Sequence, residues 1–92
     1  MKITLKAFAF FRDILDKISQ LEISPDENIQ TLLDRLCKKH SRLYGMLFDD
    51  EGQIKQMVII LKNGRNIVHL QGLATKLEDG DIISLFPPVA GG

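Results

Sequence analysis

The fold is most clearly indicated by residues 57–69, which read MVIILKNGRNIVH. The uninterrupted apolar run over residues 57–61 is typical of a buried strand. Asn63 and Gly64 follow it, and both tolerate the positive φ angles that the central positions of a type I′ turn require. The sequence therefore predicts a β-hairpin in which residues 65–69 return as the partner strand.

Three further strands are predicted, two before this hairpin and one after it. Residues 2–10 alternate between two faces, as a strand does. One face carries Ile3, Leu5, Ala7 and Ala9, and the other carries Thr4, Lys6, Phe8 and Phe10. Residues 18–23 predict a second strand, which ends at the turn residues 24–26. A turn at residues 79–81 leads into the last predicted strand, residues 82–86.

The clearest helix is predicted between the second strand and the hairpin. Asn28 is a favourable N-cap, and apolar residues recur at helical spacing over residues 29–40. Residues 41–47 predict a second helical turn. Its inward-facing residues are expected to be Leu43, Tyr44 and Leu47. Residues 49–52 indicate an exposed turn.

The elements follow the order strand, strand, helix, strand, strand, strand. One helix laid across a mixed sheet lets five short strands bury their apolar faces. The first and last strands are the most apolar, so we expect them at the centre of the sheet. The predicted fold class is α+β, a ubiquitin-like β-grasp with one main helix packed across five strands. We expect one domain over residues 1–88 and a flexible C-terminal Gly-Gly tail over residues 89–92.

Composition and charge exclude several classes of protein. The chain has 92 residues, 45% of them hydrophobic, and its 12 basic and 12 acidic residues give a formal net charge of zero. A nucleic-acid-binding protein usually carries a basic excess, so no nucleic-acid partner is predicted. No apolar run approaches the roughly 20 residues of a membrane helix, and the N-terminus lacks a signal-peptide pattern. A single cysteine cannot form an internal disulfide, so we expect a cytoplasmic protein without membrane contacts.

No catalytic or metal-binding constellation is evident among the reactive side chains. His40 lies on the helix stripe and His69 in a predicted strand, and either would need convergent partners to act. Cys37 lacks a base or cation that the sequence places beside it. Cys37 and His40 form a single i, i+3 pair, whereas a tetrahedral metal site would need a second pair. The chain is therefore expected to be non-catalytic on its own and to bind neither a metal nor a cofactor.

The C-terminal segment is the part of the sequence that suggests a function. It reads FPPVAGG over residues 86–92. The two prolines end the last strand, because neither donates a ladder hydrogen bond. The four residues after them can extend about 13 Å, and glycine lets the backbone approach another surface closely. These features favour a segment that enters a narrow channel in another protein; the alternative is a C-terminus without function, which is common in small domains.

Activation is the chemical requirement for a terminal carboxylate that acts as an acyl donor. The simplest activated form is an acyl-adenylate made from ATP, so a partner enzyme must bring ATP and the carboxylate of Gly92 together. Ala90 and Gly91 would occupy the channel, and Gly91 would give the backbone clearance. ATP is thus expected to be used by the activating partner and not held by this chain.

Several segments carry a resemblance to a known family. They are VIILKNG at residues 58–64, LEDGDI at 77–82, LFPPVAGG at 85–92, and FFRD at 10–13 after the opening strand. In this order, along essentially the whole chain, the sequence resembles the MoaD family, the small subunit of molybdopterin synthase. More broadly it is similar to the ubiquitin-like sulfur carriers and to the archaeal small modifier-like proteins.

The resemblance implies a sulfur-carrier function. A ubiquitin-activating-type adenylyltransferase would adenylate Gly92, which would then become a thiocarboxylate. The tail would enter the large subunit of molybdopterin synthase and donate sulfur to the pterin precursor of the molybdenum or tungsten cofactor. The expected docking residues are Phe86, Pro87, Pro88 and Val89, with Phe8 and Phe10 on the adjoining sheet. For the last two, packing in the core is the alternative.

Two other functions remain open. The chain is alternatively a ubiquitin-like modifier, joined through Gly92 to lysines of target proteins, or a sulfur carrier for tRNA thiolation. Activation would be the same in each case, and only the acceptor would differ. A third hypothesis is a non-catalytic β-grasp interaction module in which the Gly-Gly end has no role.

Overall fold

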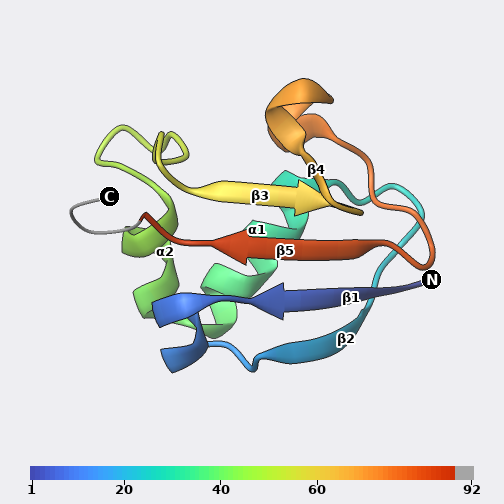
Figure 1. The fold of residues 1–92 in the computed structure, drawn as a ribbon, viewed down its shortest axis with the longest axis horizontal. Helices are drawn as coiled ribbons and strands as arrows, with labels where there is room; N and C mark the ends of the chain where they lie inside the picture. Colours follow the sequence, from blue (N-terminus) through green and yellow to red (C-terminus); the bar gives the residue numbers. More distant parts are fainter. Residues whose placement is uncertain (89–92) are drawn as a thin grey trace.

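A mixed five-stranded sheet forms one layer of the molecule, and two α-helices cover one of its faces (Figure 1). The computed structural model describes residues 1–88, so the predictions for Val89, Ala90, Gly91 and Gly92 lie outside the described residues. The strands are β1 (Lys2–Ala7), β2 (Ile18–Glu22), β3 (Ile59–Lys62), β4 (Arg65–Asn66) and β5 (Ile82–Phe86). Their order across the sheet is β2-β1-β5-β3-β4. This order confirms the ubiquitin-like β-grasp, with the first and last strands at the centre.

The two central strands run parallel and supply the inner face of the sheet. Leu5 of β1 lies opposite Ile83 of β5, and both side chains are buried. The flanking pairs, β1 with β2 and β3 with β5, are antiparallel. Parallel strands cannot be joined by a tight turn, so the chain between β1 and β5 crosses over the inner face and carries both helices there.

Helix α1 (Ile29–Lys39) begins at the predicted cap. The Asn28 side chain accepts a hydrogen bond from the Thr31 N–H at 2.9 Å, and the Thr31 hydroxyl accepts one from the Asn28 N–H at 2.9 Å. This reciprocal pair satisfies two N–H groups that the helix start leaves without partners. Leu32 and Leu33 follow one turn later and are fully buried against the sheet.

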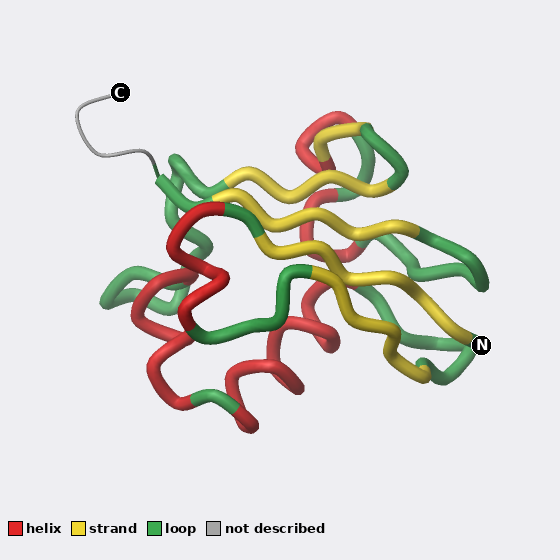
Figure 2. Tube along the Cα trace, turned by 60° about the horizontal axis from the view of Figure 1, so that its bottom comes forward, coloured by secondary structure: helices red, strands yellow, loops and turns green. Residues whose placement is uncertain are grey.

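Helix α2 (Ser41–Leu47) confirms the second predicted helical turn, and Figure 2 shows both helices on the same side of the sheet. Leu43 and Leu47 are buried, as expected. Tyr44, predicted to face inward, is instead 48% exposed, and its ring stacks on Phe48 at 4.9 Å. A seven-residue helix buries only one narrow stripe, and Tyr44 lies beside that stripe. Within residues 1–88, neither this helix nor α1 is long and apolar enough to cross a membrane.

The first strand is shorter than predicted. β1 ends at Ala7, and residues Ala9–Asp13 form a 3₁₀ turn, η1. Ala9 has a φ of 51°, a left-handed conformation that alanine rarely adopts and that no regular strand contains. The turn sends Phe11 into the core, where it is fully buried. The prediction of a strand through residue 10 was therefore wrong because burial of Phe11 overrides the alternation.

The hairpin forms with the predicted turn but with a short return strand. Asn63 and Gly64 have φ angles of 51° and 86°, as a type I′ turn requires. Only β4 (Arg65–Asn66) pairs with β3. Residues 67–69 form a second 3₁₀ turn, η2. At its start the Val68 N–H donates a hydrogen bond to the Asn66 side chain at 3.1 Å. His69 thus lies in a turn and not in a strand.

The apolar run of residues 57–61 is not buried throughout. β3 starts at Ile59, and its outward residue Ile59 is 43% exposed while Ile60 is buried. Met57, before the strand, is 60% exposed. A run without polar residues cannot show which of its side chains face solvent, since the alternation is hidden when every residue is apolar.

Candidate functional site at the C-terminal end of the sheet

β5 is the middle strand of the sheet, and the C-terminal segment of the chain follows it. It pairs with β1 on one side and with β3 on the other, so its position is held from both sides. Leu85 is fully buried, and Pro87, just beyond the strand, is buried as well. Pro88 is half-buried and is the last described residue. The two prolines stop the ladder where the sheet ends, because neither has an N–H to donate.

The face of the sheet opposite the helices carries an apolar patch beside this end of β5. The rings of Phe8 and Phe86 stack with centroids 4.2 Å apart and planes 11° from parallel. Ile59 lies opposite Phe86 in the β3–β5 register. We call Phe8, Ile59 and Phe86 the exit patch. The two α-helices lie on the other side of the sheet (Figure 2), so neither of them covers the exit patch.

Arg12 extends the exit patch with a positive charge. Its Nε donates a hydrogen bond to the Ala7 carbonyl oxygen at 3.0 Å, and its guanidinium carbon lies 5.5 Å from the centroid of the Phe8 ring. A cation at this distance from an aromatic face is attracted by the ring quadrupole. The guanidinium and the Phe86 ring both lie next to the Phe8 ring, beside the end of β5.

The sequence identified part of this site. Phe8 and Phe86, two of the expected docking residues, lie on the open face, each half-buried. Phe10 lies in η1 and not on the sheet face; it is 44% exposed and packs against Phe11, so the alternative of core packing is wrong for Phe10. Pro87 is buried and has little surface to offer a partner. The docking role of all these residues stays a prediction.

Two residues of the site were not singled out from the sequence. Ile59 was assigned to a buried strand, although its position next to the inward Ile60 would have indicated the open face. Arg12 follows Phe8 by four residues, and only the left-handed turn at Ala9 brings its side chain back over that ring. The four-residue spacing between Phe8 and Arg12 was therefore the only sequence feature that could have indicated this contact. The contact also requires the turn at Ala9, which the alternation of inward and outward residues does not predict.

The other reactive side chains lie away from the exit patch. Cys37 is half-buried on α1, and burial, followed by the nearby Asp34 charge, raises the pKa of its thiol. A raised pKa disfavours the nucleophilic thiolate. His40 is the residue that joins α1 to α2. Within residues 1–88, no three His, Cys, Asp or Glu side chains gather closely enough to hold a metal ion.

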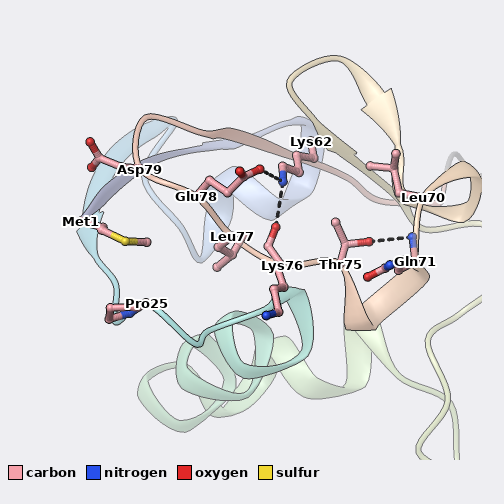
Figure 3. A pocket seen from close by; sticks show the side chains of 10 residues that line it. All are labelled: Met1, Pro25, Lys62, Leu70, Gln71, Thr75, Lys76, Leu77, Glu78 and Asp79. Carbon is pink, nitrogen blue, oxygen red and sulfur yellow. Dashed lines mark hydrogen bonds and ion pairs between the residues drawn. The ribbon is translucent and has the colours of Figure 1, made fainter.

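A cavity of about 670 Å³ lies at the opposite end of the sheet, near the N-terminus (Figure 3). Its lining includes Met1, Pro25 and Leu77. At its edge the Lys62 ammonium donates to the Lys76 carbonyl oxygen and to a Glu78 carboxylate oxygen, both at 2.8 Å. This cavity is separated from the exit patch by the length of β5, and it is not part of the candidate site.

The ion cluster beside that cavity fixes the entry to β5. The buried carboxylate of Asp81 accepts hydrogen bonds from the Asn63 side chain at 2.9 Å and from the Glu78 N–H at 2.8 Å, and it lies 3.4 Å from the Lys62 ammonium. Burial lowers the pKa of Lys62, but Glu78 and Asp81 outweigh it, and the pKa is raised. The cluster joins the hairpin turn to the segment that leads into β5.

Comparison with known proteins points to one family. A sequence profile of the ThiS family matches residues 5–92. Small archaeal modifier protein 3 from Haloferax volcanii is 43% identical over the whole of both chains. The crystal structure of SAMP1 from the same organism superimposes with a TM-score of 0.85 and 27% identity over the whole of both chains. A putative molybdopterin converting factor, subunit 1, from Pyrococcus furiosus has a TM-score of 0.71 and 27% identity, covering 96% of this chain and 98% of that one.

Proposed function

Because the chain belongs to the ThiS family of ubiquitin-like β-grasp proteins, we propose that it is a carrier whose C-terminal glycine is activated and then transferred by partner proteins. The observation that carries the proposal is the end of β5. The central strand β5, followed by Pro87 and Pro88, ends beside an apolar patch that neither α-helix covers. A carrier needs this combination, since its partner must hold the body while the tail reaches a separate active site.

Activation proceeds on the carboxylate of Gly92. A carboxylate oxygen attacks the α-phosphorus of ATP, pyrophosphate leaves, and the glycine becomes an acyl-adenylate. The partner, a ubiquitin-activating-type adenylyltransferase, binds the ATP. This chain contributes the acyl group and the docking surface, and Gly91 leaves space for the backbone in the partner's channel.

The first acceptor that we propose is a lysine of a target protein. The lysine nitrogen attacks the acyl carbon, AMP leaves, the nitrogen loses a proton, and an isopeptide bond forms. This outcome is supported by the 43% identity, over the whole chain, to small archaeal modifier protein 3.

The second acceptor is sulfur. A sulfide nucleophile attacks the acyl carbon, AMP leaves, and a thiocarboxylate forms. Within the large subunit of molybdopterin synthase, its sulfur bonds to a carbon of the pterin. Water then cleaves the acyl–sulfur bond and regenerates the carboxylate of Gly92. The likeness to the putative molybdopterin converting factor subunit supports this candidate, as does the FPPVAGG ending. Transfer of the same sulfur to tRNA is the third destination that this chemistry allows.

The experiment that tests the proposal is the intact mass of the chain recovered from its own cells under mild, non-reducing conditions. An isopeptide between Gly92 and a lysine supports the modifier, and replacement of one terminal oxygen by sulfur supports the carrier. Deletion of Gly91 and Gly92 is the matched control and should abolish both products while leaving thermal unfolding unchanged. An unmodified carboxylate, even with the adenylyltransferase and ATP present, would contradict both and favour a plain interaction module.

A further inference from the structure

The open face of the sheet carries an uneven distribution of charge. Lys6 lies on this face of β1, two residues before Phe8, opposite Ser84 of β5 and Ile18 of β2. Ile18 is 56% exposed. Together with Arg12, Lys6 makes the half of the face nearest the exit patch apolar and cationic.

The two cations lack carboxylate partners within the described chain. No ion pair within residues 1–88 includes Lys6 or Arg12. Glu22, an acidic residue of the open face, is at the far end of β2, where it pairs with the N-terminal amino group at 3.7 Å and with Lys2 at 3.9 Å. The positive charge near the exit patch is therefore not neutralised on its own face.

The acidic residues that follow Arg12 in the chain face the other layer. Asp13 lines a hollow with His40 and Arg42, at the junction of the two helices. Asp16 lines another with Arg35, between the sheet and α1. The fold thus separates Arg12 from the carboxylates closest to it in sequence.

Arg12 is also held in place before any partner arrives. The Nε hydrogen bond to the Ala7 carbonyl oxygen fixes one side of the guanidinium, and the guanidinium carbon lies 5.5 Å from the centroid of the Phe8 ring. Within residues 1–88, its two terminal nitrogens make no hydrogen bond. Two parallel N–H donors of this kind match the two oxygens of a carboxylate, and a side chain that is already ordered loses less entropy on binding.

We propose that Arg12 and Lys6 are the carboxylate-binding residues of the docking face, and that the protein which activates Gly92 presents an apolar centre flanked by acidic side chains. The apolar centre packs on the exit patch, one carboxylate binds the terminal nitrogens of Arg12, and a second binds Lys6. The inference rests on the proposed function for the identity of this partner. A protein surface is favoured over RNA as the partner. Two cations beside apolar side chains could neutralise only a few phosphates of an RNA backbone, and the formal net charge of the chain is zero.

The test is equilibrium binding of the full-length chain to the adenylyltransferase from the same cells, without ATP, so that no chemistry occurs. We expect Arg12→Ala to weaken binding by on the order of tenfold, Arg12→Glu by clearly more, and Arg12→Lys by less than either, because lysine keeps the charge but loses the paired donors. Lys6→Glu should also weaken binding, and it leaves the Arg12–Phe8 stack intact. Arg42→Glu, the same charge change on the exposed surface of α2, is the matched control and should have no effect.

A zero-length carbodiimide cross-link gives an independent readout. It joins an amine to a carboxylate in direct contact, so Lys6 should appear in a cross-linked peptide with an aspartate or glutamate of the enzyme. Lys39, on the helix layer, should not. Cross-links that involve the carboxylate of Gly92 differ in mass and are counted separately.

The outcomes separate this inference from the proposed function. If all Arg12 and Lys6 variants bind the enzyme within twofold of the unchanged chain, the docking assignment is wrong, whether or not Gly92 is adenylated. If binding depends on Arg12 but no ATP–pyrophosphate exchange follows, the docking assignment stands and the proposed function fails. Arg12 variants that lose affinity for single-stranded RNA, but not for the enzyme, would overturn the protein partner in favour of a nucleic acid. Absence of any binding by the unchanged chain would contradict both proposals.

Discussion

Replacing Leu85 and Phe86 one at a time with alanine should separate the stability of the sheet from the docking of its partner. The two residues are neighbours on β5, and their side chains point to opposite faces of the sheet. Leu85 is fully buried beneath the helices, whereas Phe86 stacks on Phe8 on the open face. The same substitution at adjacent positions therefore tests two different surfaces.

The expected magnitudes follow from these environments. Removing a fully buried leucine side chain costs about 2–5 kcal/mol, which for a domain of this size lowers the melting temperature by roughly 10–30 °C. Loss of the Phe8–Phe86 stack and of the partial burial of Phe86 should cost about 1–2 kcal/mol. Docking should respond in the opposite order. Phe86→Ala is expected to raise the KM of the chain in adenylation about tenfold or more, since it removes the centre of the exit patch.

The assay combines urea unfolding with ATP–pyrophosphate exchange, the latter measured well below the melting temperature of the Leu85→Ala variant. Phe86→Leu is the conservative control, because it keeps apolar contact with Ile59 but loses the stacked ring. Equal losses of stability at both positions would show that Phe86 belongs to the core and not to an open face. An unchanged KM in Phe86→Ala would refute the docking role of the exit patch.

Three further predictions concern the rest of the fold. Asp81→Asn should destabilise the chain by about 2–4 kcal/mol, because three donors converge on the carboxylate and an amide offers them only one acceptor oxygen. A double-mutant cycle of Asp81→Asn with Lys62→Met, measured by urea unfolding, should show a coupling free energy above about 0.5 kcal/mol. Burial opposes ionisation of Glu27, but hydrogen bonds from Arg35 and from the Ser24 N–H outweigh it and lower the pKa of the carboxyl below its ordinary value. The ionised carboxylate therefore stabilises the fold above the ordinary pKa of a glutamate, and this stabilisation is lost as the pH falls through the lowered pKa. Acid titration of the free energy of unfolding should be less steep in Glu27→Gln. Gly64→Ala should cost about 1 kcal/mol because φ is 86° there, and thermal unfolding that is unchanged would show that the turn relaxes.

The order of elements, the type of sheet and the helix start could all be predicted from the sequence. Asn28 caps α1, Asn63 and Gly64 form the turn, and Pro87 follows the last strand, as each residue type favours. These are local preferences of the backbone, set by φ angles and by the presence or absence of an N–H donor. They act within a few residues, so they can be recognised in the chain before any tertiary contact is known.

Positions that depend on the packing of distant segments could not be predicted in the same way. The alternation of residues between two faces predicted a strand through residue 10. In the structure Ala9 adopts a left-handed conformation, and the turn that it begins buries Phe11 in the core. The helical turn over residues 41–47 predicts that Tyr44 faces inward together with Leu43 and Leu47. In the structure Leu43 and Leu47 form the buried side of α2, and Tyr44 stacks on Phe48 with about half of its surface exposed.

The sequence alone therefore determined the α-helices and the five strands of this protein, their order, and the C-terminal segment that suggests a carrier, because each of these rests on short-range chemistry. Only the tertiary structure decided which apolar residues form a surface. Phe8 and Phe86 are 78 positions apart in sequence, yet the parallel pairing of β1 with β5 stacks their rings, and the turn at Ala9 adds Arg12 to them. A surface built from the two ends of a chain depends on the crossover between them, and no local pattern contains that information.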